Sequence, residues 1–351
     1  MLLSEIDRVV QESSAKLLQI AVPPVKHWLL VDTLGKDESA PLVQRTIADC
    51  QAYPPRLKLI KSMRRDGTWP ISRARKAAED AGPGPPVGWT FITMLRNLQL
   101  LEDCYTDKSE GYISAALEKI LSWQQKDGYI LGPNHDIFPL PHYNGYAVRN
   151  LFIYGMGDDP RVKKLADWLL SMQRHDGGWV IPYQEDVKYL PEYRQMKMRQ
   201  FMELVRHGDT PKSDPKGYKD IPSCIWTTMM VVRGLARGAK YRRRKELLRG
   251  ADFFLDRFFK KNWHGSYNHS EKNWTRLIYP PYIGSGITAL YLLTILGYGP
   301  SDERMEKPIR WLMSQRHSDG FWWQSDRPYA QKDQWITGFA VDILNRYRNN
   351  R

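Results

Sequence analysis

Side chains that can exchange protons gather in one short stretch of the chain, GPNHDIFPLPHY. His135, Asp136, His142 and Tyr143 fall within nine residues of one another. A carboxylate, two imidazoles and a phenol are groups that serve as general acids and bases, so we predict Asp136 and His142 as catalytic candidates. The structural alternative is that Asp136 caps a turn and that the histidines lie at the surface.

Two further carboxylates precede apolar stretches. Asp220 comes just before the stretch that begins at Ser223, and Asp333 comes just before Trp335. A carboxylate in such a position either caps the first turn of a helix or acts as an acid at the rim of a cavity. We therefore include both as candidate catalytic residues.

Aromatic side chains mark the starts of several apolar stretches. They are Trp89, Tyr143, Trp226, Tyr282 and Trp335. If these rings face a shared cavity, they can stabilise a carbocation through their π faces or stack on sugar rings, and we predict them as substrate-binding residues. Plain core packing is the alternative.

These candidates must be positioned by a repeated unit. LADWLLSMQRHDGGW, at 165 to 179, shows helical spacing of apolar residues followed by a glycine turn, and related strings recur along the chain. The anchoring glycines are Gly67, Gly128, Gly177, Gly265 and Gly320, which are 61, 49, 88 and 55 residues apart. Such spacings fit helical hairpins that bury their apolar faces by stacking on neighbours. The repeat aspartates Asp66, Asp127, Asp176 and Asp319 are expected to form the turns.

Each glycine-terminated helix is followed by a more apolar helix. The apolar helices are expected at 87–98, 143–152, 223–232, 282–293 and 334–344. An apolar set alternating with an amphipathic set predicts an inner and an outer ring, that is, an all-α fold with an α/α toroid of about five to six hairpins. We expect an N-terminal helical cap or irregular first hairpin at 1–54 and the toroid at 55–351, with a charged insertion at about 184–219.

The charge, the motifs and the cysteines of the chain limit the partners and cofactors that we expect. The net charge of +13 is partly clustered, in Tyr193–Arg206 and Arg237–Arg249, and we interpret both clusters as solvated helix faces, with contact to anionic membrane or phosphate as the alternative. Nucleic-acid recognition motifs are absent. Three cysteines without CxxC spacing imply neither disulfides nor a zinc site, so no metal and no cofactor are expected. No leader-like N-terminus is recognised, so a cytoplasmic location is expected, with peripheral membrane contact as a variant.

Outer helices that end in Gln-x-x-Asp-Gly-Gly-Trp resemble the repeats of squalene and oxidosqualene cyclases. The alternating helices resemble the toroid that these cyclases share with the β subunits of protein prenyltransferases, over roughly residues 55 to 348. The resemblance implies a substrate cavity at the end of the barrel where the inner helices begin. It also implies an isoprenoid or other apolar ligand.

The chain departs from both families at the catalytic positions. The acid string DxDD of the cyclases has no counterpart in Ser223-Cys-Ile-Trp-Thr-Thr, and the zinc ligands of the prenyltransferases are missing, because Asp49-Cys50 and Asp103-Cys104 are adjacent pairs. We favour an enzyme of terpene-cyclase type with a non-standard acid. One alternative is a lyase or hydrolase of acidic polysaccharides, which would need an Arg or Lys inside the barrel, and the candidates for it are Arg96, Arg149 and Arg233. The other alternative is a non-catalytic lipid or protein binder. Oligomeric state is left open.

Overall fold

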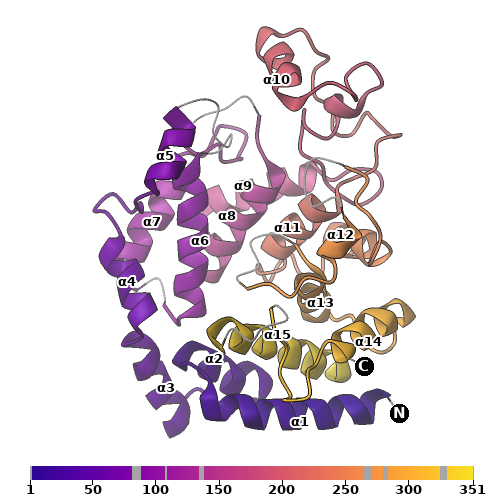
Figure 1. Cartoon of the computed structure of the whole chain (residues 1–351). Helices are drawn as coiled ribbons and strands as arrows, with labels where there is room; N and C mark the ends of the chain where they lie inside the picture. The colour runs from indigo at the N-terminus through magenta and orange to yellow at the C-terminus, as the bar shows by residue number, and fades with distance from the viewer. Residues whose placement is uncertain are drawn as a thin grey trace.

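The computed structural model describes residues 2–80, 88–106, 109–133, 138–264, 270–279, 284–324 and 330–350 (Figure 1). The α-helices are α1 (Leu2–Ile20), α2 (Pro23–Trp28), α3 (Pro41–Gln51), α4 (Pro54–Ser62), α5 (Arg73–Asp80), α6 (Trp89–Asp103), α7 (Gly111–Leu121), α8 (Pro141–Ile153), α9 (Pro160–Ser171), α10 (Met198–His207), α11 (Ile225–Leu235), α12 (Lys245–Leu255), α13 (Gly286–Ile295), α14 (Glu306–Ser314) and α15 (Ala330–Asn349). A π-helical turn, η1 (Leu29–Thr33), extends α2, and single 3-10 turns lie at Val187–Tyr189, Glu271–Asn273 and Glu303–Met305. Within the described ranges there is no strand, and the prediction of an all-α fold is confirmed.

Burial separates an inner from an outer set of helices. In α11 every residue except Arg233 is buried, whereas α9 buries only Val162, Leu165, Ala166 and Leu169, which recur at helical spacing along one face. Helices α8 and α11 pack so closely that a Cβ atom at Gly234 would come within 2.0 Å of the carbonyl oxygen of Gly145. Inner helices thus surround an axis, and outer helices cover them, which is the α/α toroid.

The repeat string builds the same turn each time. The indole Nε1 of Trp69, Trp179 and Trp322 donates to the carbonyl ten residues earlier, at 2.9, 2.7 and 2.7 Å, and each indole is buried. Asp66, Asp176 and Asp319 accept a backbone N–H two residues on, as turn-forming aspartates do. The string therefore encodes a helix end and a buried anchor.

Glutamines join successive outer helices. The Gln124 amide donates to the carbonyl of Gly128 in its own turn and to that of Arg161 at the start of α9, at 2.7 and 2.8 Å. Gln173 does the same to Gly177 and to Glu246 of α12. These two repeats are thereby tied to the outer helix of the next.

The N-terminal helix occupies the corresponding place after the last repeat. Ser13 and Lys16 of α1 donate to the carbonyls of Gly320 and Asp319, at 2.8 and 2.7 Å, and α1 packs along α15 (Figure 1). The following segment, α2 with η1, also packs against α15. The two ends of the chain therefore meet and close the ring.

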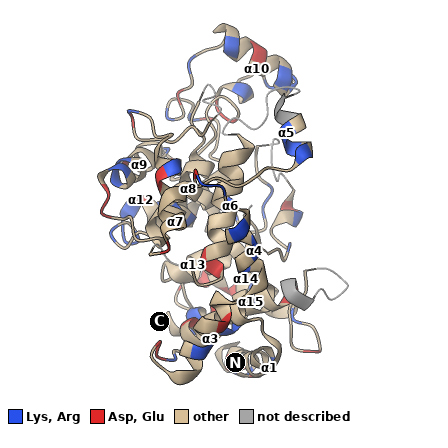
Figure 2. Cartoon of the chain, turned by 90° about the vertical axis from the view of Figure 1, so that its left-hand side faces the viewer, with Lys and Arg blue, Asp and Glu red and all other residues tan. Residues whose placement is uncertain are grey.

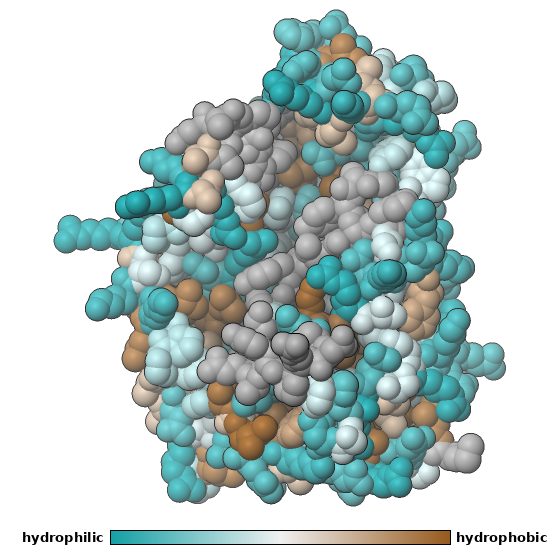
Figure 3. Space-filling model, in the orientation of Figure 1, coloured by the Kyte–Doolittle hydropathy of each residue, from teal (hydrophilic) through white to brown (hydrophobic). Residues whose placement is uncertain are grey.

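The insertion forms a small unit of its own. Val187, Phe201 and Val205 pack together around α10, and the buried Arg174 in the third repeat turn donates to the Tyr218 carbonyl at 2.7 Å. Figure 2 marks Lys and Arg residues along α10 and α5, and hydrophilic residues cover most of the described surface in Figure 3. Across the described residues, no helix is both long and apolar enough to traverse a bilayer.

Candidate active site

The ring encloses a cavity of ≈ 210 Å³ to which every inner segment contributes. Its lining comprises Pro24, His27, Trp28 and Asp32 of α2 and η1, Gln99, Glu102, Asp103 and Tyr105 at the end of α6, Arg149 of α8, Arg233 and Arg237 of α11 and its end, Ile278, Ile287, Thr288 and Tyr291 around α13, and Trp335 and Phe339 of α15. We call this space the barrel cavity. It lies where residues from distant parts of the sequence converge, as ligand sites commonly do.

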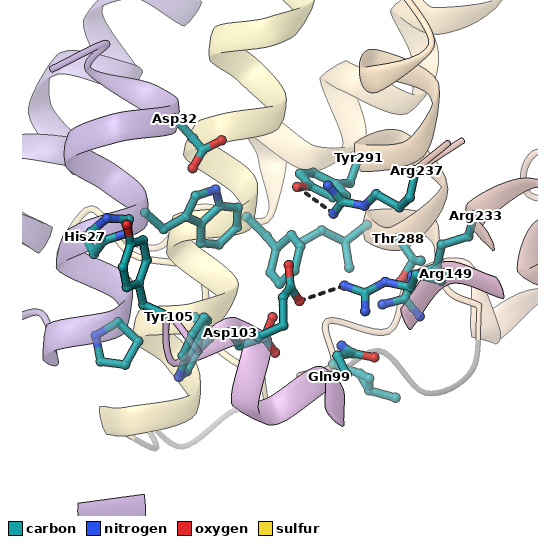
Figure 4. A pocket seen from close by; sticks show the side chains of 17 residues that line it. His27, Asp32, Gln99, Asp103, Tyr105, Arg149, Arg233, Arg237, Thr288 and Tyr291 are labelled. Carbon is teal, nitrogen blue, oxygen red and sulfur yellow. Dashed lines mark hydrogen bonds and ion pairs between the residues drawn. The ribbon is translucent and has the colours of Figure 1, made fainter. Parts of the chain in front are cut away.

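The barrel cavity has two chemically different sides, with carboxyl groups between them. In Figure 4, Arg149, Arg233 and Arg237 lie on one side of the cavity, together with Tyr291. His27 and Tyr105 lie on the opposite side, and Asp103 projects between the two sides. An ionic wall therefore faces a wall built largely of rings across a short distance.

The surroundings of Glu102 and Asp103 shift the pKa values of these two carboxyl groups in opposite directions. Glu102 accepts a bond from Arg149 at 2.9 Å, and although burial opposes ionisation, Arg149 and Arg237 lower the pKa of Glu102. Burial, followed by the negative charge of Glu102, raises the pKa of Asp103 to about 7. Two neighbouring carboxyl groups with separated pKa values are a common arrangement for acid catalysis.

A tyrosine holds the Asp103 carboxyl in place. The hydroxyl of Tyr279 donates to Asp103 Oδ2 at 2.8 Å. The ring of Tyr279 stacks on Trp335, with centroids 4.5 Å apart and planes at 3°. Asp103 is thus positioned next to an extended π surface, and this surface continues through Phe339 to Trp28, whose centroids are 4.6 Å apart.

The arginine side is crowded with positive charge. Burial, followed by the charge of Arg149, lowers the pKa of Arg233 to about 10. For Arg237, burial acts in the same direction but Tyr291 and Glu102 outweigh it and raise the pKa, and Arg237 donates to the Tyr291 hydroxyl at 3.4 Å. Arg237 was expected on a solvated basic face; that interpretation is wrong, because the side chain turns inward past the end of α11 into the barrel cavity.

A second, smaller pocket of ≈ 40 Å³ lies nearer the starts of the inner helices. Its lining includes Ile92, Arg96, His142, Tyr143, Tyr146, Ile181, Glu185, Cys224, Trp226, Thr227, Met230 and Gly284. The Tyr146 hydroxyl donates to Gln99 Oε1 at 2.5 Å, so these two side chains stand between this pocket and the barrel cavity. We call it the upper pocket.

The candidates predicted from the sequence are divided between these spaces. His142, Tyr143 and Trp226 line the upper pocket, and Trp335 lines the barrel cavity. Burial lowers the pKa of His142 to about 4, so the ring is neutral near pH 7. Its Nδ1 has no hydrogen-bond partner within the part of the chain that the structure describes.

The remaining candidates lie elsewhere. Trp89 starts α6 beneath the guanidinium of Arg75, 4.7 Å from its ring, and lines neither space. Asp333 is buried and accepts the backbone N–H of Gln324 at 2.9 Å, and Asp220 is exposed. His135, Asp136 and Tyr282 lie outside the described residues.

Asp103, Glu102, Arg237 and Tyr279 were missed, although a signal for three of them exists. The cavity-facing positions follow helical spacing: 92, 96, 99, 102 and 103 on α6, and 226, 230, 233 and 237 along α11. Polar residues at this spacing, late in an otherwise apolar helix, mark a lined cavity. These residues were missed because the prediction considered only the starts of the inner helices. In addition, α6 runs five residues beyond its predicted end at 98.

Comparison with known proteins finds only solved structures of low similarity. No protein-family profile matches the chain, and no curated protein is similar to it. A solved protein from Actinoplanes has 14% identity and a TM-score of 0.44, covering 98% of this chain and 99% of its own. The type II terpene cyclase MstE from Scytonema has 14% identity and a TM-score of 0.29, covering 88% and 98%, and a variant bound to geranylgeranyl dihydroxybenzoate has 14% identity, a TM-score of 0.30 and the same coverage.

Proposed function

We propose that this protein is an acid-catalysing enzyme of terpene-cyclase type, which protonates an isoprenoid inside the barrel cavity with Asp103 as the proton donor. The observation that carries the proposal is the Asp103 carboxyl itself. It lines the cavity, its pKa is raised to about 7, and it is fixed by Tyr279 beside the ring of Trp335. A substantial fraction therefore retains its proton near neutral pH.

The proposed step balances without a co-reactant. The O–H bond of Asp103 breaks, a C–H bond forms at one carbon of a substrate double bond, and the other carbon becomes a cation. Loss of a proton from the rearranged cation to a carboxylate or to water restores a neutral product, so the net reaction is an isomerisation. Asp103 regains its proton by exchange with the solvent.

The surroundings of Asp103 favour this transfer. The Tyr279 hydroxyl and the charge of Arg149 both stabilise the carboxylate that remains after the proton leaves. The π faces of Trp335, Trp28 and Phe339 line the same cavity and stabilise a nearby cation, each contact contributing about 0.5 to 2 kcal/mol. Tyr279 and Arg149 thus stabilise the negative charge that the transfer creates, and the rings stabilise the positive charge.

A second candidate is an enzyme acting on an acidic glycan, and the arginines favour it. Arg149 and Arg233 line the barrel cavity, as that alternative required, whereas Arg96 lines the upper pocket. Against it, the barrel cavity lies inside the ring between six inner segments, whereas a polysaccharide chain is usually bound along an open groove. The cyclase-type proposal therefore remains the better fit.

Product analysis tests the proposal. The full chain would be incubated with linear sesqui-, di- and triterpenoid-length isoprenoids, as alcohols and as diphosphates, and the extract analysed by gas chromatography and mass spectrometry. We expect an isomer of one substrate from the wild type and from Asp158→Asn, an exposed control carboxylate, and at least a hundredfold less from Asp103→Asn. Equal product from Asp103→Asn, or depolymerisation of acidic oligosaccharides in a parallel assay, would refute the assignment.

A further inference from the structure

Three guanidinium groups share one wall of the barrel cavity, and we propose that Arg149, Arg233 and Arg237 bind an anionic group of the ligand: a phosphate, a diphosphate or a carboxylate. The substrate class that follows is an isoprenoid carrying an anionic end. This inference rests on the proposed function in taking the barrel cavity as the ligand site and an isoprenoid as the ligand.

The fold brings the three arginines together from two neighbouring helices. Arg233 and Arg237 are four residues apart at the end of α11, so they lie one above the other on the same side. Arg149 comes from α8, which the glycine contact between Gly145 and Gly234 holds close to α11. Figure 4 shows all three guanidinium groups on one side of the cavity.

The donor groups on this wall are incompletely used by the protein. Arg149 is 3% exposed and donates to Glu102 at 2.9 Å and to Asn150 Oδ1 at 3.1 Å, and its Nε finds no hydrogen-bond partner among the described residues. A guanidinium carries five N–H donors in a fixed fork that suits the oxygens of carboxylates and phosphates. The wall therefore offers charged donors of the kind that an oxyanion accepts.

The carboxyl groups of the cavity do not balance this wall. Glu102 is engaged by Arg149, and Asp103 is partly protonated near neutral pH. Asp32 lies on the far side in Figure 4 and pairs with Arg346 at 3.4 Å. Because burying several positive charges together is costly, a ligand anion would offset the charge of this wall.

The same anion is needed by the proposed chemistry. Three guanidinium groups on one wall would repel a carbocation that forms beside Asp103, and they would do so strongly, because the surroundings are poorly screened. An anionic end on the substrate neutralises them before the cation appears. A neutral hydrocarbon cannot supply this, so the structure favours an amphiphilic substrate whose chain lies against Trp28, Trp335 and Phe339.

Titration calorimetry on the full chain tests the site with three probes: inorganic diphosphate, farnesyl diphosphate and farnesol. We expect farnesyl diphosphate to bind at least tenfold more tightly than farnesol. Arg233→Gln should weaken both diphosphates by about 10- to 100-fold and leave farnesol unchanged. Arg199→Gln, on the exposed surface of α10, is the matched control and should change none of the three affinities.

The other outcomes overturn the inference or separate it from the proposed function. Equal affinity of the wild type for farnesol and farnesyl diphosphate would do so even if Arg233→Gln failed to fold. So would diphosphate binding that Arg199→Gln weakens as much as Arg233→Gln, because it would place the anion on the basic surface. If a neutral isoprenoid is isomerised by Asp103 without anion binding, the proposed function stands and the arginine site fails. If diphosphates bind through Arg233 and nothing is isomerised, the arginine site stands alone.

Discussion

At the scale of single residues, Asp103 is defined by opposing influences on its proton. Burial and the adjacent Glu102 carboxylate raise its pKa, and Arg149 and the Tyr279 hydroxyl lower it, so that it comes to about 7. Burial alone would keep the carboxyl permanently protonated, and the arginine alone would keep it ionised. The combination gives a group that both holds and releases a proton near neutral pH.

This pKa predicts how stability depends on pH. The folded protein holds the Asp103 proton up to about pH 7, whereas the unfolded chain releases it near 3.8, so the folded state binds more protons between these values. The free energy of unfolding should therefore fall as the pH rises through this window. Urea unfolding of Asp103→Asn should show a smaller fall than the wild type between about pH 5 and pH 8.

Two other carboxyl groups set the controls for this experiment. Burial also raises the pKa of Asp342, to about 6, so part of the fall should persist in Asp103→Asn. The exposed Asp158, whose pKa the Lys240 ammonium lowers, stays ionised throughout, and Asp158→Asn should match the wild type. An identical slope for Asp103→Asn and the wild type would show that Asp103 does not hold a proton in this range.

At the scale of elements, the repeat turns limit what can replace their glycines. Gly177 has φ +90°, and a Cβ atom there would lie 2.9 Å from the carbonyl oxygen of Arg249 in the next outer helix. Gly177→Ala should therefore lower the free energy of unfolding by about 1 to 3 kcal/mol. Gly111, at the start of α7, has open space around it, and Gly111→Ala should be neutral or raise stability slightly. Thermal unfolding of Gly177→Ala and Gly111→Ala measures both effects. An equal loss of stability in the two variants would refute this explanation of the turn.

The repeat turns could be predicted from the sequence, whereas the contacts between remote helices could not. The Trp, Asp and Gly of each repeat act within a dozen residues of one another, so a string such as that around Trp179 predicts its own turn and, by repetition, the all-α toroid. Asp103 and Arg237 acquire their roles from helices remote in sequence: Asp103 from Tyr279, and Arg237 from Tyr291. Local patterns do not contain such pairings, so helix starts were favoured over the helix ends where the barrel cavity lies.

At the scale of the whole molecule, the ring depends on its N-terminal helix. Ile6, Val9, Val10 and Leu17 of α1 are buried in the structure, and α1 is joined to the last repeat turn by Ser13 and Lys16. Leu17→Ala should therefore cost about 2 to 5 kcal/mol in the free energy of unfolding. Ile20→Ala, where the side chain is 53% exposed on the same helix, should cost well under 1 kcal/mol. Denaturant unfolding of the pair tests ring closure, and a Leu17→Ala effect as small as that of Ile20→Ala would speak against it.

The measurement that tests the central claim most directly is the transfer of solvent hydrogen to the product. In deuterium oxide, a protonated Asp103 that exchanges with the solvent should place one deuterium at a former double-bond carbon of the isoprenoid. The rate should decline as the pH rises above about 7, because the carboxyl loses its proton there. A product formed without deuterium, or a labelled product formed equally well by Asp103→Asn, would contradict the account of Asp103 as the acid.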